Sequence, residues 1–440
     1  MNTPIYDFAK KYAESGAVRA HMPGHKGIGN LGVEALDITE ITGADSLYEA
    51  CGIIRESEEN ASRLFGAHTF YSTEGSSLAI RAMLAIVVKY AALRGKAPTV
   101  LAARNVHKSF VYASALVGAK EEWIYSDSFL SCELSPDRLE ARIAECDPVA
   151  VYLTSPDYLG RVADISALAK ICHAHGVLLL VDNAHGAYLK FLTPSRHPID
   201  LGADVVCDSA HKTLPVLTGG GYLHISNSAP RELVDFARSS MELFGSTSPS
   251  YLILESLDLA NRAISEGYAE RIRALADKAD NMRRKLNTGG YVIISDESLK
   301  LTFCAKEYGY SGGELATLLE ERGIYPEFYD PDYLVLMLTP ELRENELSRI
   351  EDTFLSIPRR APMYESAPFP PRPERVLSPR EALFAPSESV PVSNSVGRIL
   401  AAASVGCPPA VPIAISGERI DGDTARAFEY YGISDISVVK

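Results

Sequence analysis

Short apolar runs recur along the chain and constrain its fold more than any other feature. They are PTVLAA (98–103), VAVYLT (149–154), VLLLVD (177–182), DVVC (204–207) and GYLHIS (221–226). Because each run is continuous rather than alternating, both faces of each strand are expected to be covered. Helical patterns separate the runs, so the sequence predicts an α/β fold with a mostly parallel sheet. Ligands of such sheets bind at the carboxyl ends of the strands.

The chain of 440 residues is longer than one hydrophobic core usually covers, so several domains are expected. Segment 266–358 predicts a small α+β domain, with an amphipathic helix (YAERIRALADKADNMRRKLN) and the strand-like runs YVIIS and LVLMLT. The proline-rich segment 359–391 disfavours helix and central strand, and is expected to be an extended surface connector. The mixed segment 392–440 is expected to form a third, C-terminal unit.

Composition narrows the class of protein. A formal net charge of -14 argues against a nucleic-acid or anionic-membrane surface. We see no signal peptide at the start and no membrane-spanning run, and the seven cysteines form no CxxC pair. A cytoplasmic, reduced protein is therefore expected. No metal site is predicted, since the histidines of CHAHG (172–176) are explained by a helix end.

The stretch VVCDSAHKTLPVLTGGGYLH (205–224) places Lys212 just after residues that are expected to be interior. One explanation is a lysine at a strand end whose ammonium reaches the surface. The other is a lysine whose amine forms an imine with a carbonyl cofactor. The second explanation requires the remaining partners of that cofactor elsewhere in the chain.

Three further features could supply those partners, although each has a simpler explanation. Asp182 ends an apolar run, where it could pair with the protonated nitrogen of a pyridine ring or cap a neighbouring loop. The turn from Thr73 to Ser77 precedes a long apolar helix and could hold a phosphate or act only as an N-cap. His107, in ARNVHKSF, could stack on a flat ring or be an ordinary core or surface histidine.

The order of these features is more specific than any one of them. A phosphate turn, a stacking residue, a strand-end Asp and a later Lys follow one another as in fold type I enzymes that use pyridoxal phosphate. The chain resembles the bacterial ornithine/lysine/arginine decarboxylase family, in the short form that lacks an N-terminal wing domain. The motifs that carry the resemblance are HMPGHKG (21–27), GADSLYEACGII (43–54), TEGSS, NVHKS (105–109), TSPDYLG (154–160), DNAHGAYL, DSAHKTLPVLTGGGYLH, STSPSYLILESLD (246–258) and VGRILAAASVGCPPAVPIAISGERI (396–420).

The resemblance implies an N-terminal arm (1–40), a large domain that binds pyridoxal phosphate (41–265), the small domain (266–358), the connector (359–391) and a C-terminal domain (392–440). It implies Lys212 as the Schiff-base lysine, Asp182 on the pyridine nitrogen and His107 over the ring. Further cofactor contacts are implied for Gly75, Ser76, Ser77, Ala184, His185, Ser209 and His211. Lys212 or His185 would return a proton to the substrate carbon.

The resemblance also implies how subunits and substrate are arranged. The loop Ser246, Thr247, Ser248 is similar to a segment that such enzymes lend to the neighbouring subunit's cofactor, so a homodimer with shared sites is implied. Glu418 corresponds to a glutamate near the substrate's distal cationic group. An anion there suits a basic amino acid, whereas an exposed turn residue next to Gly417 is the alternative.

Several positions depart from the family pattern. Relatives usually read T-N-G-T-S and D-E-A-H-G-A-H, whereas this chain has Glu74 for the Asn, Asn183 for the Glu and Tyr188 for the last His. Because the first two changes look reciprocal, we hypothesise that side chains 74 and 183 are in contact. Ala410 and Ser416 also depart from the C-terminal motif.

The leading interpretation is decarboxylation of L-lysine, L-arginine or L-ornithine to cadaverine, agmatine or putrescine. Another reaction on the same cofactor, such as transamination or elimination, is an alternative, because fold does not settle reaction. A degenerate, non-catalytic homologue is a third. The presence of both Asp182 and Lys212 argues against that third interpretation.

Overall fold

The computed structural model describes residues 1–126, 133–368, 372–407 and 411–440. The chain divides into two compact units, each made of several segments. The first comprises Met1–Pro98, Val149–Tyr152 and Ile165–Arg273, and the second comprises Thr99–Pro148, Leu153–Asp164 and Ala274–Lys440.

The five strands that contain the apolar runs form a seven-stranded sheet together with two others. The order of the strands is β1 (Ala67–Ser72), β7 (Gly221–Ser226), β6 (Val205–Asp208), β5 (Leu178–Asp182), β4 (Ala150–Thr154), β2 (Thr99–Ala103) and β3 (Lys120–Ile124). β5 and β6 are parallel, as are β2 and β3, which agrees with the predicted α/β class. β7 (Gly221–Ser226) instead runs antiparallel to both of its neighbours, β1 and β6. The GYLHIS run was therefore rightly predicted as a buried strand, but its direction departs from that of a parallel sheet.

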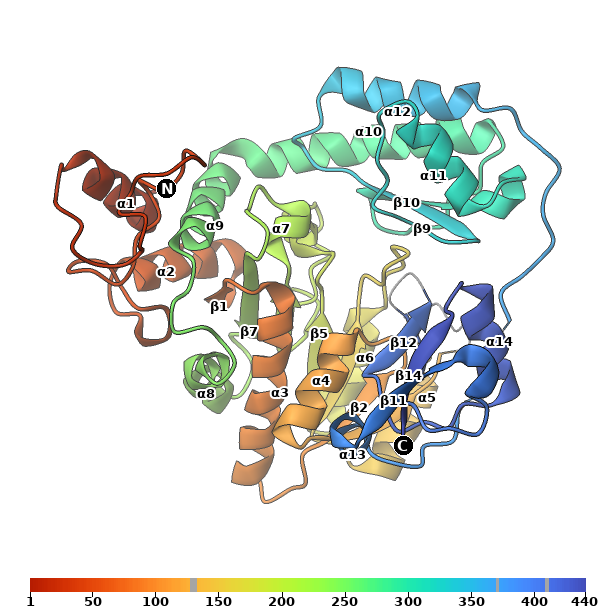
Figure 1. The fold of residues 1–440 in the computed structure, drawn as a ribbon. Coiled ribbons are helices and arrows are strands. Elements are labelled where there is room, and N and C mark those ends of the chain that lie inside the picture. Colours follow the sequence, from red (N-terminus) through yellow and green to blue (C-terminus); the bar gives the residue numbers. More distant parts are fainter. Residues whose placement is uncertain (127–132, 369–371, 408–410) are drawn as a thin grey trace. The chain divides into compact units, whose positions relative to one another are not determined.

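The first unit begins with helices α1 (Pro4–Glu14) and α2 (Ile53–Phe65) (Figure 1). Its other helices are α3 (Gly75–Leu93), α6 (Ile165–Ala174), α7 (Ala210–Thr213), α8 (Arg231–Glu242) and α9 (Tyr251–Ala263), with short turns at Leu47–Glu49, Ala187–Phe191 and Ile264–Tyr268. Its strands are β1 (Ala67–Ser72), β5 (Leu178–Asp182), β6 (Val205–Asp208) and β7. The boundary between the units falls within β4 (Ala150–Thr154).

Helix α3 carries the phosphate-turn motif at its first residues and is the core helix of the first unit. Its apolar side chains, such as Leu78, Met83 and Ile86, are fully buried, as the helical pattern predicted. Among the described residues α3 is also the one helix long and apolar enough to cross a membrane by length and composition. Its burial in this fold accounts for that composition equally well.

The second unit contains one group of elements before residue 150 and a longer group that begins at Ala274, within α10. The first group is β2 (Thr99–Ala103), α4 (Lys108–Val117), β3 (Lys120–Ile124) and α5 (Pro136–Cys146). The longer group is α10 (Ala269–Thr288), β8 (Lys300–Cys304), a turn at Ala305–Tyr308, α11 (Gly312–Glu320), β9 (Phe328–Tyr329), β10 (Tyr333–Met337), α12 (Glu344–Ser356), α13 (Pro379–Phe384), β11 (Ser387–Pro391), a turn at Val392–Asn394, β12 (Ser404–Cys407), β13 (Val411–Ile415), α14 (Gly422–Tyr430) and β14 (Asp435–Val439).

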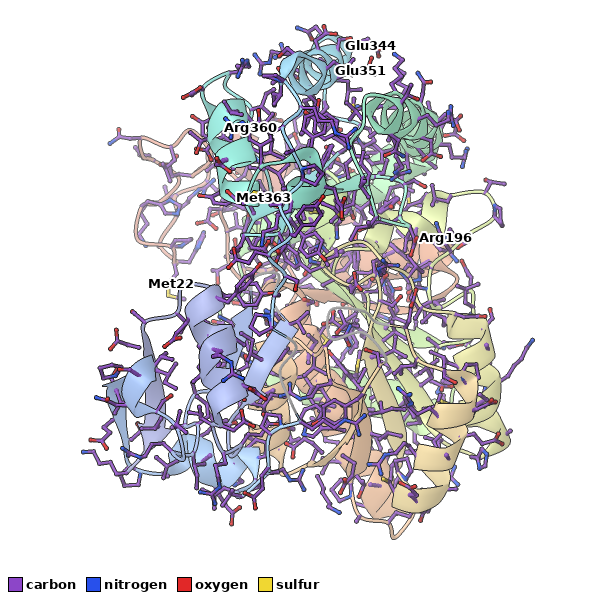
Figure 2. The ribbon with its side chains drawn as sticks, turned by 90° about the vertical axis from the view of Figure 1, so that its right-hand side faces the viewer. Met22, Arg196, Glu344, Glu351, Arg360 and Met363 are labelled. Atoms are coloured by element: carbon purple, nitrogen blue, oxygen red, sulfur yellow. The ribbon has the colours of Figure 1, made fainter. Side chains whose placement is uncertain are left out.

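The segment predicted as a small α+β domain contains a three-stranded antiparallel sheet in the order β8-β10-β9. Helices α10 and α12 lie side by side and are joined by ion pairs from Lys278 to Glu344 and from Lys285 to Glu351, the latter 2.7 Å long (Figure 2). The predicted strand YVIIS is not formed. Ile293 makes only an isolated bridge to Phe303, supported by hydrogen bonds from the amide of Ile294 to the carbonyl oxygen of Thr302, at 3.0 Å, and from the amide of Cys304 to the carbonyl oxygen of Val292, at 2.9 Å.

The C-terminal segment has a hydrophobic core of its own, which includes Leu400, Ile413, Phe428 and Val438. Two-stranded sheets β11-β14 and β12-β13 cover this core together with α14. The proline-rich segment is more ordered than predicted, since it contains both α13 and β11. Pro379 occupies the first turn of α13, where no amide donor is needed, and Ser378 caps that helix.

Candidate active site

Lys212 lies in the short helix α7, directly after strand β6, and is half-buried. Its Nζ atom lies 2.9 Å from Nε2 of His185. His185 is itself buried and follows strand β5. The ammonium of Lys212 therefore does not simply extend into solvent, as the first explanation of this lysine required.

Asp182 is the last residue of β5, and its register partner on the parallel strand β6 is Cys207. Its side chain is 2 % exposed and accepts hydrogen bonds from the hydroxyl of Tyr152, at 3.2 Å, and from the backbone amide of Ala184, at 3.1 Å. The sulfur of Cys207 lies 3.6 Å from the same carboxylate, and burial raises the pKa of this thiol. Asp182 thus has the predicted buried position and also caps the following loop.

The phosphate turn and the lysine segment meet directly. Gly75 opens helix α3 with a φ of 63°, which favours glycine. The Ser209 hydroxyl donates to the Ser76 hydroxyl at 2.9 Å and accepts from the Ser76 amide at 3.3 Å. A Cβ on Gly221 would lie 3.0 Å from the carbonyl carbon of Gly75, so glycine permits this close approach. Hydroxyls and amides at the start of a long helix form an anion site.

His211 completes this side of the site. Its Nδ1 atom lies 2.9 Å from the carbonyl oxygen of Gly220, and its ring lies near Gly75. Burial lowers the pKa of His211, although the Gly220 carbonyl opposes this effect. Gly75, Ser76, Ser209 and His211 are therefore brought together as predicted, and Ser77 follows them in the first turn of α3.

The Glu74 carboxylate is directed toward the STSPS loop, where it accepts the backbone amide of Ser246 at 3.0 Å. The side chain of Asn183 instead donates to Asp208 at 2.6 Å. Among the described residues no hydrogen bond joins Glu74 to Asn183. The direct hydrogen bond of the hypothesised exchanged pair is therefore not formed, because each side chain has a different partner. Ser246, Thr247 and Ser248 are exposed in the single chain.

His107 and Glu418 belong to the second unit. His107 caps α4, and its Nδ1 atom accepts the amide of Ser109 at 3.2 Å. Glu418 is only 2 % exposed, so it is not the exposed turn residue of the alternative. Its Oε2 atom accepts from Nη2 of Arg104, at 2.8 Å, and from the amide of Ile415, at 2.7 Å. Burial raises the pKa of Glu418, and Arg104 opposes this effect.

Residues 3–301 match the family model described as Orn/Lys/Arg decarboxylase, major domain. Residues 363–435 match the model of the C-terminal domain of the same family. The chain belongs to the Orn/Lys/Arg decarboxylase family.

Relatives match over nearly the full length of this decarboxylase. The uncharacterized protein YaaO of Bacillus subtilis (strain 168) is 32 % identical over 97 % of the chain and 93 % of its own length. An arginine decarboxylase of Halalkalibacterium halodurans is 30 % identical over 95 % of the chain and 91 % of its own length. Among solved structures, lysine decarboxylase A from Pseudomonas aeruginosa is 19 % identical to this chain, with a TM-score of 0.81. The match covers 99 % of this chain and 80 % of the length of that structure's chain. That similarity confirms the predicted fold.

Pyridoxal phosphate is the cofactor of this family, and the residues of the first unit fit it. An amine is held near a histidine, a buried carboxylate ends the adjacent strand, and hydroxyls and amides gather at a helix start. Thr213, one residue after Lys212, has a buried hydroxyl with no partner in the described part of the chain. An amine, a buried carboxylate and a group of hydroxyls and amides at a helix start therefore lie at the ends of neighbouring strands.

Sequence reasoning missed a buried cluster beside these residues. His197, Asp208 and His224 are 0 % exposed and present atoms within 4.8 Å of one another. Asp208 directly precedes Ser209, and His224 points inward from β7, so the strand patterns offered a signal for both. His197 lies outside any regular strand, and nothing in its local sequence singled it out.

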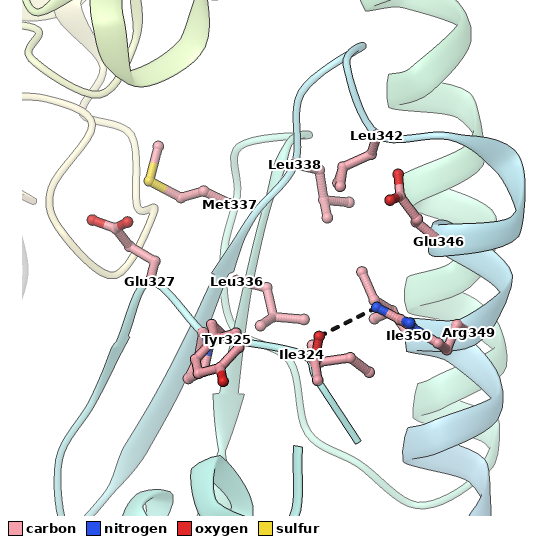
Figure 3. A pocket seen from close by; sticks show the side chains of 12 residues that line it. Ile324, Tyr325, Glu327, Leu336, Met337, Leu338, Leu342, Glu346, Arg349 and Ile350 are labelled. Atoms are coloured by element: carbon pink, nitrogen blue, oxygen red, sulfur yellow. Dashed lines mark hydrogen bonds between the residues drawn. The ribbon is translucent and has the colours of Figure 1, made fainter. Parts of the chain in front are cut away.

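A groove in the small domain is a separate feature (Figure 3). Tyr325, Leu336, Leu338 and Ile350 contribute apolar surface, and Arg349 donates to the carbonyl oxygen of Gly323 at 3.2 Å. None of the predicted site residues lines this groove. It therefore contributes nothing to the assignment of the active site.

Proposed function

We propose that this decarboxylase acts on a basic L-amino acid, namely lysine, arginine or ornithine, and releases CO2 and the corresponding amine. The observation that carries the proposal is the junction of the Lys212 segment with the phosphate turn, through the 2.9 Å contact between Ser209 and Ser76. Relatives named arginine decarboxylase support arginine as the first substrate to test.

Pyridoxal phosphate bound at these residues would supply a ring that takes up the electron pair left when CO2 departs. In the proposed assignment Lys212 holds the cofactor covalently, and Asp182 stabilises positive charge on its ring nitrogen. The turn amides with Ser76, Ser77, Ser209 and His211 hold the phosphate. His107 and Ala184 are proposed to line the ring.

The residues of the chain would then position the bond that breaks. During the reaction the bond between Cα and the carboxylate carbon breaks, the electron pair stays with Cα, and one proton is added there. Lys212 and His185 lie within hydrogen-bonding distance of each other, so the pair can hold that proton on Nζ or on Nε2. A proton supplied at a fixed position favours amine formation over other reactions at Cα.

Glu418 is the proposed acceptor for the distal cation of the substrate. Both of its hydrogen bonds are made by Oε2, so Oε1 has no assigned partner among the described residues. A carboxylate that is already oriented by Arg104 and Ile415 presents its second oxygen in a fixed direction. The exposed loop Ser246, Thr247, Ser248 supports a homodimer in which each subunit contributes to the other's site, in a cytoplasmic enzyme.

The test is to incubate the protein loaded with pyridoxal phosphate separately with L-lysine, L-arginine and L-ornithine, and to measure CO2 and the product amine. One amine formed in equal amount to CO2, and lost in Lys212→Ala, is the expected result. A keto acid in place of the amine would favour transamination. No product from any of the three would contradict the proposal.

A further inference from the structure

The carboxylate of Asp208 is the centre of a hydrogen-bond network that the proposed function does not yet use. Its Oδ1 atom accepts from Nδ2 of Asn183 at 2.6 Å. Its Oδ2 atom accepts from Nε2 of His197 at 3.0 Å and from Nε2 of His224 at 3.2 Å. All four residues are 0 % exposed, so these contacts are shielded from water and from salt.

The ionisation state of this network follows from its contacts. His197 accepts the backbone amide of Ile199 at its Nδ1 atom, so its Nε2 atom carries the proton. Burial lowers the pKa of His224, and its Nδ1 atom lies 2.9 Å from the hydroxyl of Thr69. Burial raises the pKa of Asp208, but the two histidines outweigh burial and hold that pKa well below its usual range. Asp208 is thus an ionised carboxylate with three donors.

The amide of Asn183 has only one suitable orientation. Turned around, its carbonyl oxygen would face the Asp208 carboxylate and repel it. Its Oδ1 atom has no hydrogen-bond partner in the described part of the chain. A buried acceptor without a partner costs free energy, and the short hydrogen bond from Nδ2 to Asp208 offsets that cost. A Cβ at position 186 would lie 2.0 Å from that same Oδ1 atom, so Gly186 leaves space for this orientation.

The contact joins the two segments that carry the proposed chemistry. Asn183 follows Asp182 and lies two residues before His185, at the end of β5. Asp208 ends β6 and precedes Ser209, four residues before Lys212. The backbone amide of Asn183 also donates to the carbonyl oxygen of Cys207 at 2.9 Å. Displacement of one segment relative to the other would alter the 2.9 Å contact between Lys212 and His185.

We infer that Asn183 and Asp208 are positioning residues that set the distance between the Lys212 amine and the His185 imidazole. This inference rests on the proposed function, in which Lys212 and His185 hold the proton that is added to the substrate carbon. It also gives a physical reason for an amide at position 183. A carboxylate there would face the ionised Asp208 in a site without water.

The test uses the protein loaded with pyridoxal phosphate and three variants. Asn183→Asp places two carboxylates in contact. The double variant Asn183→Asp, Asp208→Asn restores one amide and one carboxylate with their positions exchanged, and the new Asn oxygen can accept from both histidines. Asp204→Asn is the matched control, because Asp204 joins the opposite ends of the same strands by accepting the amide of Leu179 at 2.7 Å.

Three quantities are measured for each protein: kcat, the melting temperature, and the pH midpoint at which the visible absorption of the bound cofactor changes. For Asn183→Asp we expect kcat to fall by about tenfold or more and the pH midpoint to rise, since added negative charge favours a protonated amine. The double variant should recover most of kcat. Asp204→Asn should lower the melting temperature alone.

The inference would be overturned if Asn183→Asp lowered the melting temperature but left kcat and the pH midpoint unchanged. It would also be overturned if the double variant regained wild-type stability without regaining kcat. Failure of the proposed function is distinguished separately, because that function is decided by product formation in the wild type and its loss in Lys212→Ala.

Discussion

Nζ of Lys212 and Nε2 of His185 lie 2.9 Å apart, although the two residues belong to segments that follow different strands. If this pair holds the proton that reaches the substrate carbon, Asn or Gln at position 185 keeps a polar group but removes the titratable nitrogen. We expect His185→Gln to lower kcat by about 10²-fold, which is typical of a lost general acid or base, with a smaller effect on KM. Steady-state kinetics with the substrate of the wild type measure both constants.

His173→Gln is the control for this prediction. His173 also contacts a carboxylate, at 3.1 Å from Asp204, but lies at the end of α6. It should leave kcat within about twofold of the wild type. Equal losses of activity in the two variants would show that His185 has only a structural role.

Asp182→Asn tests the proposed contact with the cofactor's ring nitrogen. The substitution keeps the size of the side chain and one oxygen that can accept from the amide of Ala184, and its amide nitrogen can donate to the Tyr152 hydroxyl, but it removes the negative charge. Pyridoxal phosphate should still bind, as seen in its visible absorption, while kcat falls by about 10²-fold or more because positive charge on the ring is no longer stabilised. Retention of full kcat would contradict this role of Asp182.

The ion pair between Arg104 and Glu418 is buried, and its Nη2 to Oε2 distance is 2.8 Å. Loss of one partner leaves an uncompensated buried charge, so Arg104→Met should destabilise the protein by about 3–5 kcal/mol. The double variant Arg104→Met, Glu418→Leu should be less destabilised than the single variant. Thermal unfolding of the wild type, the single variant and the double variant measures whether their stabilities fall in this order.

Glu418→Gln separates a substrate role from this structural one. Gln keeps an acceptor for the amide of Ile415 but removes the charge that a cationic substrate would meet. We expect KM for the basic amino acid to rise by about tenfold or more. An unchanged KM together with lower stability would assign Glu418 to structure alone.

The strands and the order of the site residues could be predicted because they depend on local patterns. Apolar runs identified β2, β4, β5, β6 and β7 to within one or two residues of their ends. The positions of Asp182 and Lys212 relative to β5 and β6 followed directly from those runs.

The partners of buried polar side chains could not be predicted, because they depend on register and on contacts distant in sequence. Asn183 hydrogen-bonds to Asp208, which is 25 residues later in the sequence, on the neighbouring strand. The departures from the family pattern had instead suggested Glu74 as the partner of Asn183. Glu418 pairs with Arg104, which lies 314 residues earlier in the sequence. Neither pairing has a signature in the residues that flank it.

Glu255 of α9 makes the stability of the protein depend on pH between about pH 4 and pH 8. Its side chain is 3 % exposed, and burial raises its pKa to about 8, with further contributions from Asp37 and Asp258. In the unfolded chain the pKa of a glutamate is about 4.3. Since the folded pKa is the higher one, the stabilising contribution of protonated Glu255 is complete below about pH 4 and is lost as the pH rises toward 8.

Glu255→Gln keeps the neutral form at every pH, so its melting temperature should rise relative to that of the wild type between pH 5 and about pH 8, and the difference should then stay constant. The slope expected for one proton is about 1.4 kcal/mol per pH unit. Glu232→Gln, at an exposed position of α8, is the matched control and should show no such trend. A constant difference between Glu255→Gln and the wild type across this range would mean that Glu255 is ionised in the folded protein.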